Sequence, residues 1–151
     1  MKRFLFLILI LSFYVSAEEQ AITQWAYTQL ERAQANLDKG NVEAAEKIYY
    51  DNSNSTWSSK SYDHFVFLRT YSYFLLSFDR NEEALRYLKQ ASLKRDMPPY
   101  DIFELHFTLG QVYYVTGDRE NAKKTLLKWV EIGEKNKLDL KPEGYAILAT
   151  I

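Results

Sequence analysis

Residues 103–130, FELHFTLGQVYYVTGDRENAKKTLLKWV, predict two amphipathic helices that fold back on each other at a Gly-Asp turn. Apolar residues recur at three- and four-residue steps in both halves, which is the spacing of a helix with one apolar side. One helix pair cannot bury both apolar stripes alone, so further helices must pack against it. The two stripes are expected to contain Leu109, Tyr113 and Val115 in the first helix, and Ala122, Leu126, Leu127 and Val130 in the second.

The same stretch resembles the tetratricopeptide repeat (TPR), a helix-turn-helix unit of about 34 residues that stacks into arrays. Small residues at Gly110 and Ala122 suit the close approach of two helices, and Gly117 suits a helix end with positive φ. His106 and Trp129 depart from the family pattern. With Phe103 at the first position, the positions that define the repeat hold Leu109, Gly110, Tyr113, Gly117, Ala122 and Leu126.

The rest of the chain shows the same register. The signature alanines Ala45, Ala84 and Ala122 lie 39 and 38 residues apart, which is a period typical of helical arrays. Gly40 is the turn glycine of the first repeat, whereas Asp79 stands where the second repeat should have one. We therefore predict three repeats and the start of a fourth, at about residues 26–59, 65–98, 103–136 and from 142.

The resemblance implies an all-α fold in which antiparallel helix pairs stack as a right-handed superhelical solenoid over residues 18–151. Within it, the sequence predicts a first helix over residues 20–38 and a long polar loop over residues 51–60. Trp57 in that loop is expected to fold back onto the nearest helix, with a role in partner binding as the alternative.

The first 17 residues have the pattern of a cleavable export signal. Lys2 and Arg3 precede an apolar run over residues 4–15, and small residues then lead to a cleavage point after Ala17. The run is shorter than the stretch of about 20 residues that a membrane-spanning helix needs. We predict a signal peptide over residues 1–17 and a periplasmic location; the alternative is an uncleaved N-terminus anchored in the inner membrane.

Composition narrows the class of protein further. The chain contains no cysteine, which excludes disulfides and thiolate metal sites and favours a bacterial periplasm over a disulfide-rich extracellular module. Removal of Lys2 and Arg3 with the signal moves the formal net charge from −1 to −3. That weak acidity gives no reason to expect a nucleic-acid partner.

Residues suited to catalysis are scarce. His64 and His106 are the two histidines, too few for a three-histidine metal site. Asp63 and His64 are adjacent on a helix and face different directions, which suits neither a general base nor its orienting carboxylate. His106 is expected to be hydrogen-bonded within the core. We predict no enzyme activity, no catalytic residue, no cofactor and no metal.

Binding is the function that the TPR resemblance implies. In that family the inner face of the array is lined by the first helix of each repeat, and a protein or peptide partner lies against it. The lining here is aromatic, aliphatic and neutral polar with Arg69 as its cation, which suits a peptide or a partner helix. The alternative is that its aromatic residues only fill space between repeats. The candidate groove residues are Tyr27, Leu30, Gln34, Arg69, Tyr73, Leu76, Phe107, Gln111 and Tyr114.

The last third of the chain also resembles exported TPR proteins that accompany TonB-type energy transduction in Gram-negative bacteria. The similar segments are residues 109–113 (LGQVY), 127–129 (LKW) and 145–149 (YAILA). This resemblance implies a non-catalytic periplasmic scaffold or adaptor in such a complex. The alternatives are a coordinator of cell-wall or outer-membrane assembly, a helical accessory part of a cell-wall hydrolase, and self-association through the C-terminal helix.

Overall fold

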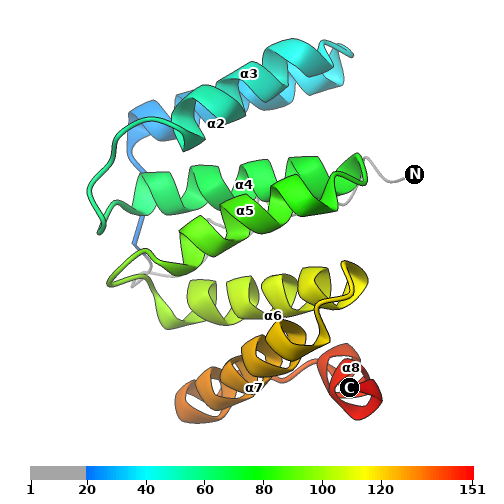
Figure 1. Cartoon of the computed structure of the whole chain (residues 1–151). Helices are drawn as coiled ribbons and strands as arrows, with labels where there is room; N and C mark the ends of the chain where they lie inside the picture. Colours follow the sequence, from blue (N-terminus) through cyan, green and yellow to red (C-terminus); the bar gives the residue numbers. More distant parts are fainter. Residues whose placement is uncertain (1–19) are drawn as a thin grey trace.

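The computed structural model describes residues 20–151, which form seven α-helices joined by turns and loops (Figure 1). The predicted signal peptide lies outside the described residues. No strand occurs among residues 20–151, so the prediction of an all-α fold is confirmed for this part of the chain. The helices are α2 (Gln24–Asp38), α3 (Val42–Ser53), α4 (Tyr62–Ser77), α5 (Asn81–Ser92), α6 (Pro99–Val115), α7 (Arg119–Asn136) and α8 (Pro142–Thr150).

The helices form antiparallel pairs that stack in chain order. The pairs α2–α3, α4–α5 and α6–α7 lie one below another in Figure 1, and each also contacts the next pair. In this view α3, α5 and α7 lie in front of their partners. We call the side of α2, α4 and α6 that faces away from α3, α5 and α7 the inner face. At the end of the stack, α8 packs against α6 and α7.

The three turns within the pairs share one hydrogen-bonding pattern. Gly40, Asp79 and Gly117 have positive φ values of 81°, 58° and 86°. Glycine adopts this conformation without steric cost, and aspartate is among the few other residues that enter it readily. Asp79 therefore builds the same turn without the expected glycine. In each turn a backbone amide donates to the carbonyl five residues earlier: Asn41 to Asn36 at 2.8 Å, Arg80 to Leu75 at 3.0 Å, and Asp118 to Tyr113 at 2.9 Å.

Small side chains lie where the paired helices touch. Ala45, Ala84 and Ala122, one in the second helix of each pair, are all 0% exposed. A Cβ atom at Gly110 would lie 2.6 Å from Cγ of Leu126, closer than atoms in real contact. These positions hold the helices of each pair at a distance that a larger residue could not maintain.

Two residues of the expected apolar stripes lie on the surface. Val115 and Leu127 are 67% and 52% exposed, so the sequence prediction is wrong at these positions. Val115 is the last residue of α6, where the helix leaves the interface. Leu127 follows the fully buried Leu126, and one residue further along a helix is a rotation of about 100°.

Two element boundaries also differ from the sequence prediction. The first helix begins at Gln24 instead of residue 20, because the Oγ1 atom of Thr23 caps it by accepting a hydrogen bond from the amide of Ala26. The second helix continues to Ser53, so the following polar loop is shorter than residues 51–60 would make it.

A large aromatic residue of α7 seats α8. Trp129, at a position where the TPR pattern prefers a small residue, is 0% exposed. Its ring centroid lies 5.6 Å and 5.2 Å from those of Phe103 and Phe107 on α6. Gly144 of α8 lies directly on this ring, since a Cβ atom there would be 2.4 Å from Cζ3 of Trp129. Because Gly144 has no side chain, the ring of Trp129 can pack directly against the backbone of α8.

We expect Gly144→Val to lift α8 from Trp129 and to cost about 2 kcal/mol of unfolding free energy, the typical cost of overpacking. Helix propensity alone would favour valine over glycine, so a loss can only come from the contact. Urea unfolding followed by circular dichroism measures the change. The control is Ala146→Val, because Ala146 is exposed on the same helix. Equal stability of the two variants would contradict this packing.

Candidate binding surface

The nine candidate groove residues lie on α2, α4 and α6, and the structure buries three of them. Leu30, Arg69 and Phe107 are 5%, 5% and 8% exposed. Across the junction of α4 and α6, Oη of Tyr73 lies 3.5 Å from Oγ1 of Thr108. The remaining candidates are half-buried: Tyr27, Gln34, Tyr73, Leu76, Gln111 and Tyr114.

Arg69 forms an ion pair between two inner helices. Its Nη1 atom donates to Oδ1 of Asp101 at 2.8 Å, and Asp101 is 6% exposed. Tyr62 donates its hydroxyl to the other oxygen of this carboxylate at 3.0 Å. The guanidinium also lies 5.3 Å from the ring centroid of Phe65. A buried carboxylate needs such partners, so Arg69 neutralises Asp101 and ties α4 to α6.

Phe107 belongs to the core under α8. Besides its contact with Trp129, its ring lies 4.5 Å from Nζ of Lys141, just before α8. Lys141 donates to Oε2 of Glu104 at 2.7 Å, which places an ion pair beside the ring. Phe107 therefore supports the end of the array more than it lines an open groove.

Hydroxyl and amide groups of the half-buried candidates have partners close by. Tyr27 donates to Glu31 at 2.7 Å, and Gln34 donates to Asp38 at 2.8 Å. The hydroxyl of Tyr114 accepts from Oγ1 of Thr150 in α8 at 3.3 Å. What these residues offer a partner is ring surface and neutral hydrogen-bonding groups.

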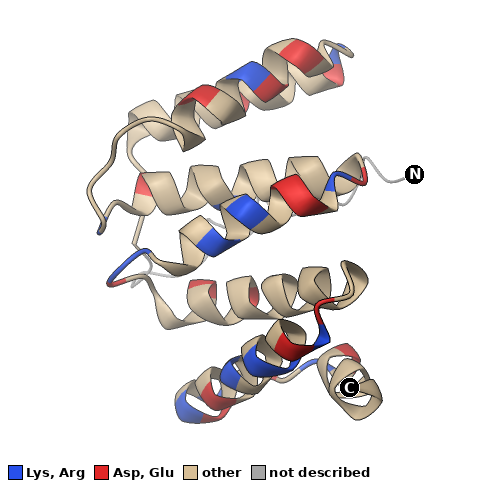
Figure 2. Ribbon diagram, in the orientation of Figure 1, with Lys and Arg blue, Asp and Glu red and all other residues tan. Residues whose placement is uncertain are grey.

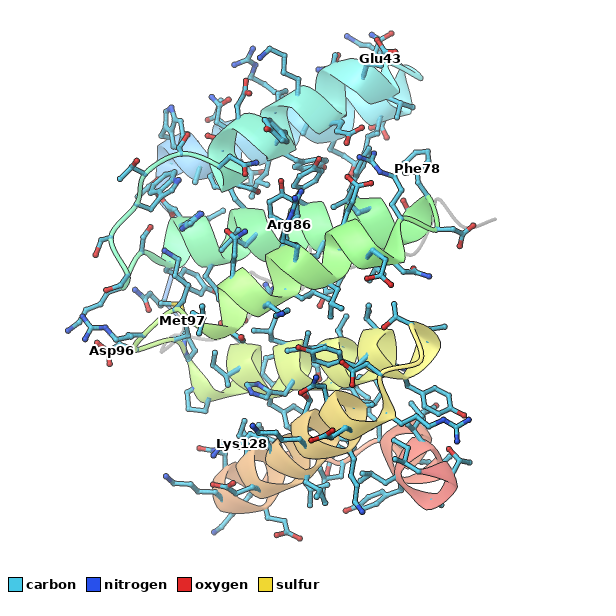
Figure 3. The ribbon with its side chains drawn as sticks, viewed as in Figure 1. Glu43, Phe78, Arg86, Asp96, Met97 and Lys128 are labelled. Carbon is cyan, nitrogen blue, oxygen red and sulfur yellow. The ribbon has the colours of Figure 1, made fainter. Side chains whose placement is uncertain are left out.

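Charge is distributed unevenly between the two layers of helices. In Figure 2, α3, α5 and α7 carry many coloured charged segments, whereas α4 and α6 are mostly uncoloured. Figure 3 labels Glu43, Arg86 and Lys128, one on each of α3, α5 and α7. Between α2 and α3 lies an open hollow of about 440 Å³, whose lining includes Arg32, Lys47 and Asp51. The inner helices α4 and α6 are therefore the less charged layer.

A cluster of rings closes the loop between α3 and α4. Trp57 donates its indole N–H to the carbonyl of Asn52 at 2.8 Å, and its ring stacks on His64 with centroids 5.7 Å apart. The prediction that Trp57 folds back onto a helix is confirmed. Trp25 covers this cluster, 5.9 Å from Trp57 and 6.0 Å from Phe67. Trp25 itself is 50% exposed, so this cluster borders solvent.

Burial lowers the pKa of both histidines. For His64 the loss of solvent is the largest cause, the nearby charge of Lys94 lowers the pKa further, and the hydrogen bond between Nε2 and the Ser53 carbonyl opposes both. For His106 burial again dominates, and the 2.8 Å bond between Nδ1 and the Ile102 carbonyl opposes it. His106 is hydrogen-bonded, as the sequence predicts, but it is half-buried instead of lying within the core.

Asp63 and His64 serve different structural contacts. Asp63 accepts from the amide and the hydroxyl of Thr23, at 2.9 Å and 2.7 Å, and His64 bonds to Ser53. Within residues 20–151 no group of three or more His, Cys, Asp or Glu side chains is placed to hold a metal ion. In the same part of the chain, no helix is long and apolar enough to cross a membrane.

Breaking the buried ion pair should destabilise the fold strongly. We expect Arg69→Met to cost about 3–5 kcal/mol of unfolding free energy, because it leaves the Asp101 carboxylate buried and without its cation. Arg69→Met combined with Asp101→Leu should recover most of that loss. The control is Lys47→Ala, whose pair with Asp51 is exposed at 74% and 53% and should change stability by about 0.5 kcal/mol or less. Chemical denaturation measures all three, and similar losses for Arg69→Met and Lys47→Ala would rule out this role.

The histidines should make the fold less stable in mild acid. A lowered folded-state pKa means that the unfolded chain binds more protons below its ordinary histidine pKa of about 6.5, so stability falls as pH drops through that value. We expect the thermal midpoint to decrease between pH 7.5 and pH 5.5, by less in His64→Gln and by least when His106→Gln is added. An unchanged pH dependence in the double variant would assign the effect to other groups.

Comparisons with known proteins agree with this architecture. No protein-family model matches the sequence, and no curated protein matches it. Solved structures do match, among them the crystal structure of PcrH from Pseudomonas aeruginosa. That structure aligns with a TM-score of 0.55 and 12% sequence identity, over 90% of this chain and 92% of PcrH. At this identity the likeness shows the fold alone, which is a TPR-like helical repeat.

Proposed function

We propose that this chain is a non-catalytic scaffold that binds a protein or peptide partner on its inner face. The observation that carries the proposal is the character of that face. Tyr73, Gln111 and Tyr114 are half-buried there, and the ionic groups Arg69 and Glu104 are paired within the chain. Side chains of this kind suit an apolar or neutral segment of a partner.

The fold supports a binding role over a chemical one. Stacked helix pairs present a long surface built from several repeats, and a TPR-like array uses it for proteins or peptides. Because Arg69 is already committed to Asp101, the inner face is a poor clamp for an acidic peptide terminus. The partner segment that fits is neutral, with apolar side chains and few charges.

The proposal also includes a cellular location, the periplasm. The basic start, the apolar run and the small residues of the first 17 positions support export to the periplasm. The resemblance of residues 109–149 to exported TPR proteins that accompany TonB-type systems supports an envelope energy-transduction complex as the site of action.

Site-specific photo-crosslinking tests the proposed function. We place a photo-reactive phenylalanine analogue at Tyr73, on the inner face, or at Lys124, which is exposed on α7. Crosslinking in intact cells should give a defined adduct from Tyr73 and none from Lys124. The captured protein is identified by mass spectrometry, and its binding to the purified chain is then measured.

Two substitutions on the inner face sharpen the test. Tyr73→Ala with Gln111→Ala should weaken binding of the purified partner by about tenfold or more, since buried aromatic contacts dominate such interfaces. Phe107 is left intact because it supports Trp129. Equal adducts from both positions, or unchanged affinity in the folded double variant, would refute binding on the inner face.

A further inference from the structure

Each of the inner helices α2, α4 and α6 carries a small residue that is completely covered. Ala33 on α2 and Ser72 on α4 are 0% exposed, and Gly110 on α6 lies against Leu126 of α7. The three positions are 39 and 38 residues apart, which is the period of the array. They therefore mark the same point in each pair, where the second helix, α3, α5 or α7, packs against the first.

The equivalent point on α8 is uncovered. Ala149 follows Gly110 by 39 residues and is exposed. Tyr145, one turn before Ala149, is 46% exposed, whereas the equivalent residues of α4 and α6, Leu68 and His106, are fully buried and half-buried. Within the described part of the chain no second helix pairs with α8, since α7 is already paired with α6. Thus α8 is the first helix of a pair whose second helix is missing from residues 20–151.

The opposite side of α8 is fixed to the array. Gly144 lies on the ring of Trp129, and the Oγ1 atom of Thr150 donates to the hydroxyl of Tyr114 at 3.3 Å. Ala149 is five residues after Gly144, which places it about 140° around the helix from this contact. The exposed side of α8 is therefore held in place and points away from the helices that support it.

We propose that the stripe formed by Tyr145 and Ala149 docks one amphipathic helix of a partner protein, which takes the place of the second helix in a fourth pair. The small side chain of Ala149 lets a helix approach closely, and the ring of Tyr145 supplies apolar contact area. Helix binding of this kind uses apolar residues that recur at three- and four-residue steps. The site is separate from the inner face and goes beyond the proposed function.

The three second helices define what the partner helix must carry. Each has an alanine at the contact point and a large apolar or aromatic residue one turn later, and all six residues are 0% exposed. The alanine permits close approach, and the larger residue fills the space beside it. The pairs are Ala45 with Tyr49, Ala84 with Leu88, and Ala122 with Leu126. The partner helix should have alanine followed four residues later by leucine or tyrosine.

A second copy of this chain is a poor source of such a helix. The three pairs of residues just named are completely buried, so a copy could offer them only by unfolding. In α8 the residue four places after Ala146 is the polar Thr150, so two α8 helices do not supply the pattern to each other. Ala44 and Ile48 of α3 have the right spacing, but charged residues border them. These observations favour a helix from a different protein.

A peptide taken from the chain itself serves as the probe. Residues 41–54, made with blocked ends, contain α3 with its Ala45 and Tyr49. In the chain α3 packs on α2, whose Ala33 is the same residue type as Ala149. Titrated into the purified full chain, the peptide should shift the NMR signals of α8. NMR suits this test because a short peptide folds at an entropic cost and binds weakly.

Matched variants locate the contact. Ala149→Trp should weaken peptide binding by about tenfold or more, because a large side chain prevents close approach. The control is Glu143→Trp, since Glu143 is exposed on the same helix but about 120° around it from Ala149. A peptide with Ala45→Trp should also fail to bind. Circular dichroism confirms that both chain variants remain folded.

Photo-crosslinking in cells then identifies the natural partner. A photo-reactive phenylalanine analogue at Tyr145 should give an adduct that the same analogue at Glu143 does not give. Mass spectrometry should map the crosslinked segment to a helix with alanine and a large apolar residue four places apart. A synthetic peptide of that segment should lose affinity for the chain with Ala149→Trp.

Three outcomes would overturn the proposal. The first is a peptide that leaves the α8 signals unchanged up to its solubility limit, and the second is equal affinity for the Ala149→Trp and Glu143→Trp variants. The third is a Tyr145 adduct with another copy of this chain, which would assign the surface to self-association. Tyr73→Ala with Gln111→Ala should leave peptide binding at α8 unchanged, so this site and the inner face can fail separately.

Discussion

The architecture depends on how closely the two helices of each pair approach. Ala45, Ala84 and Ala122 are completely buried at equivalent points, and Gly110 allows Leu126 to lie against the backbone of α6. A larger side chain at any of these points would push a pair apart and change the angle at which it meets the next. Because each pair contacts only its neighbours, such a change would carry along the stack. The position of the inner face is set by these small contacts.

The sequence was sufficient for the parts of the fold that are local and periodic. Helices, turns and the small contact residues follow spacing rules, and Asp79 could be placed because its neighbours kept the register. The stripe assignment failed at Leu127, which follows the buried Leu126 but is rotated away from the interface, and at Val115, where α6 ends. The spacing of apolar residues locates the buried side of a helix only to within about one residue. Helix propensity does not improve this, because it does not depend on which side of the helix a residue occupies.

Contacts between distant residues were beyond the sequence analysis. Arg69 and Asp101 are 32 residues apart, and nothing in either segment indicates that they pair. Trp129 looked like a mismatch because its compensation, the absent side chain of Gly144, lies on another helix. The one available signal was a glycine within a short apolar helix, where glycine weakens the helix and so suggests close packing.

Ion pairs within the chain also limit which kinds of partner the candidate binding surface can recognise. Arg69 is the one cation among the nine candidate groove residues, and its carboxylate partner Asp101 is internal. As the proposed binding surface, the inner face would select a partner by shape and by apolar match. Selectivity of that type would be broad, because many neutral segments of suitable length satisfy it.

The two ends of the stack differ in chemistry. At the α2–α3 end, the charged residues Arg32, Lys47 and Asp51 border the hollow between the two helices. At the other end, Tyr145 of α8 is 46% exposed, and Ile147 and Leu148 beside it are only half-buried. Water solvates the charged groups of the first end well and the apolar side chains of α8 poorly. The exposed apolar side chains of α8 therefore make this end of the stack the place where burial under a further apolar surface would remove poorly solvated groups from water.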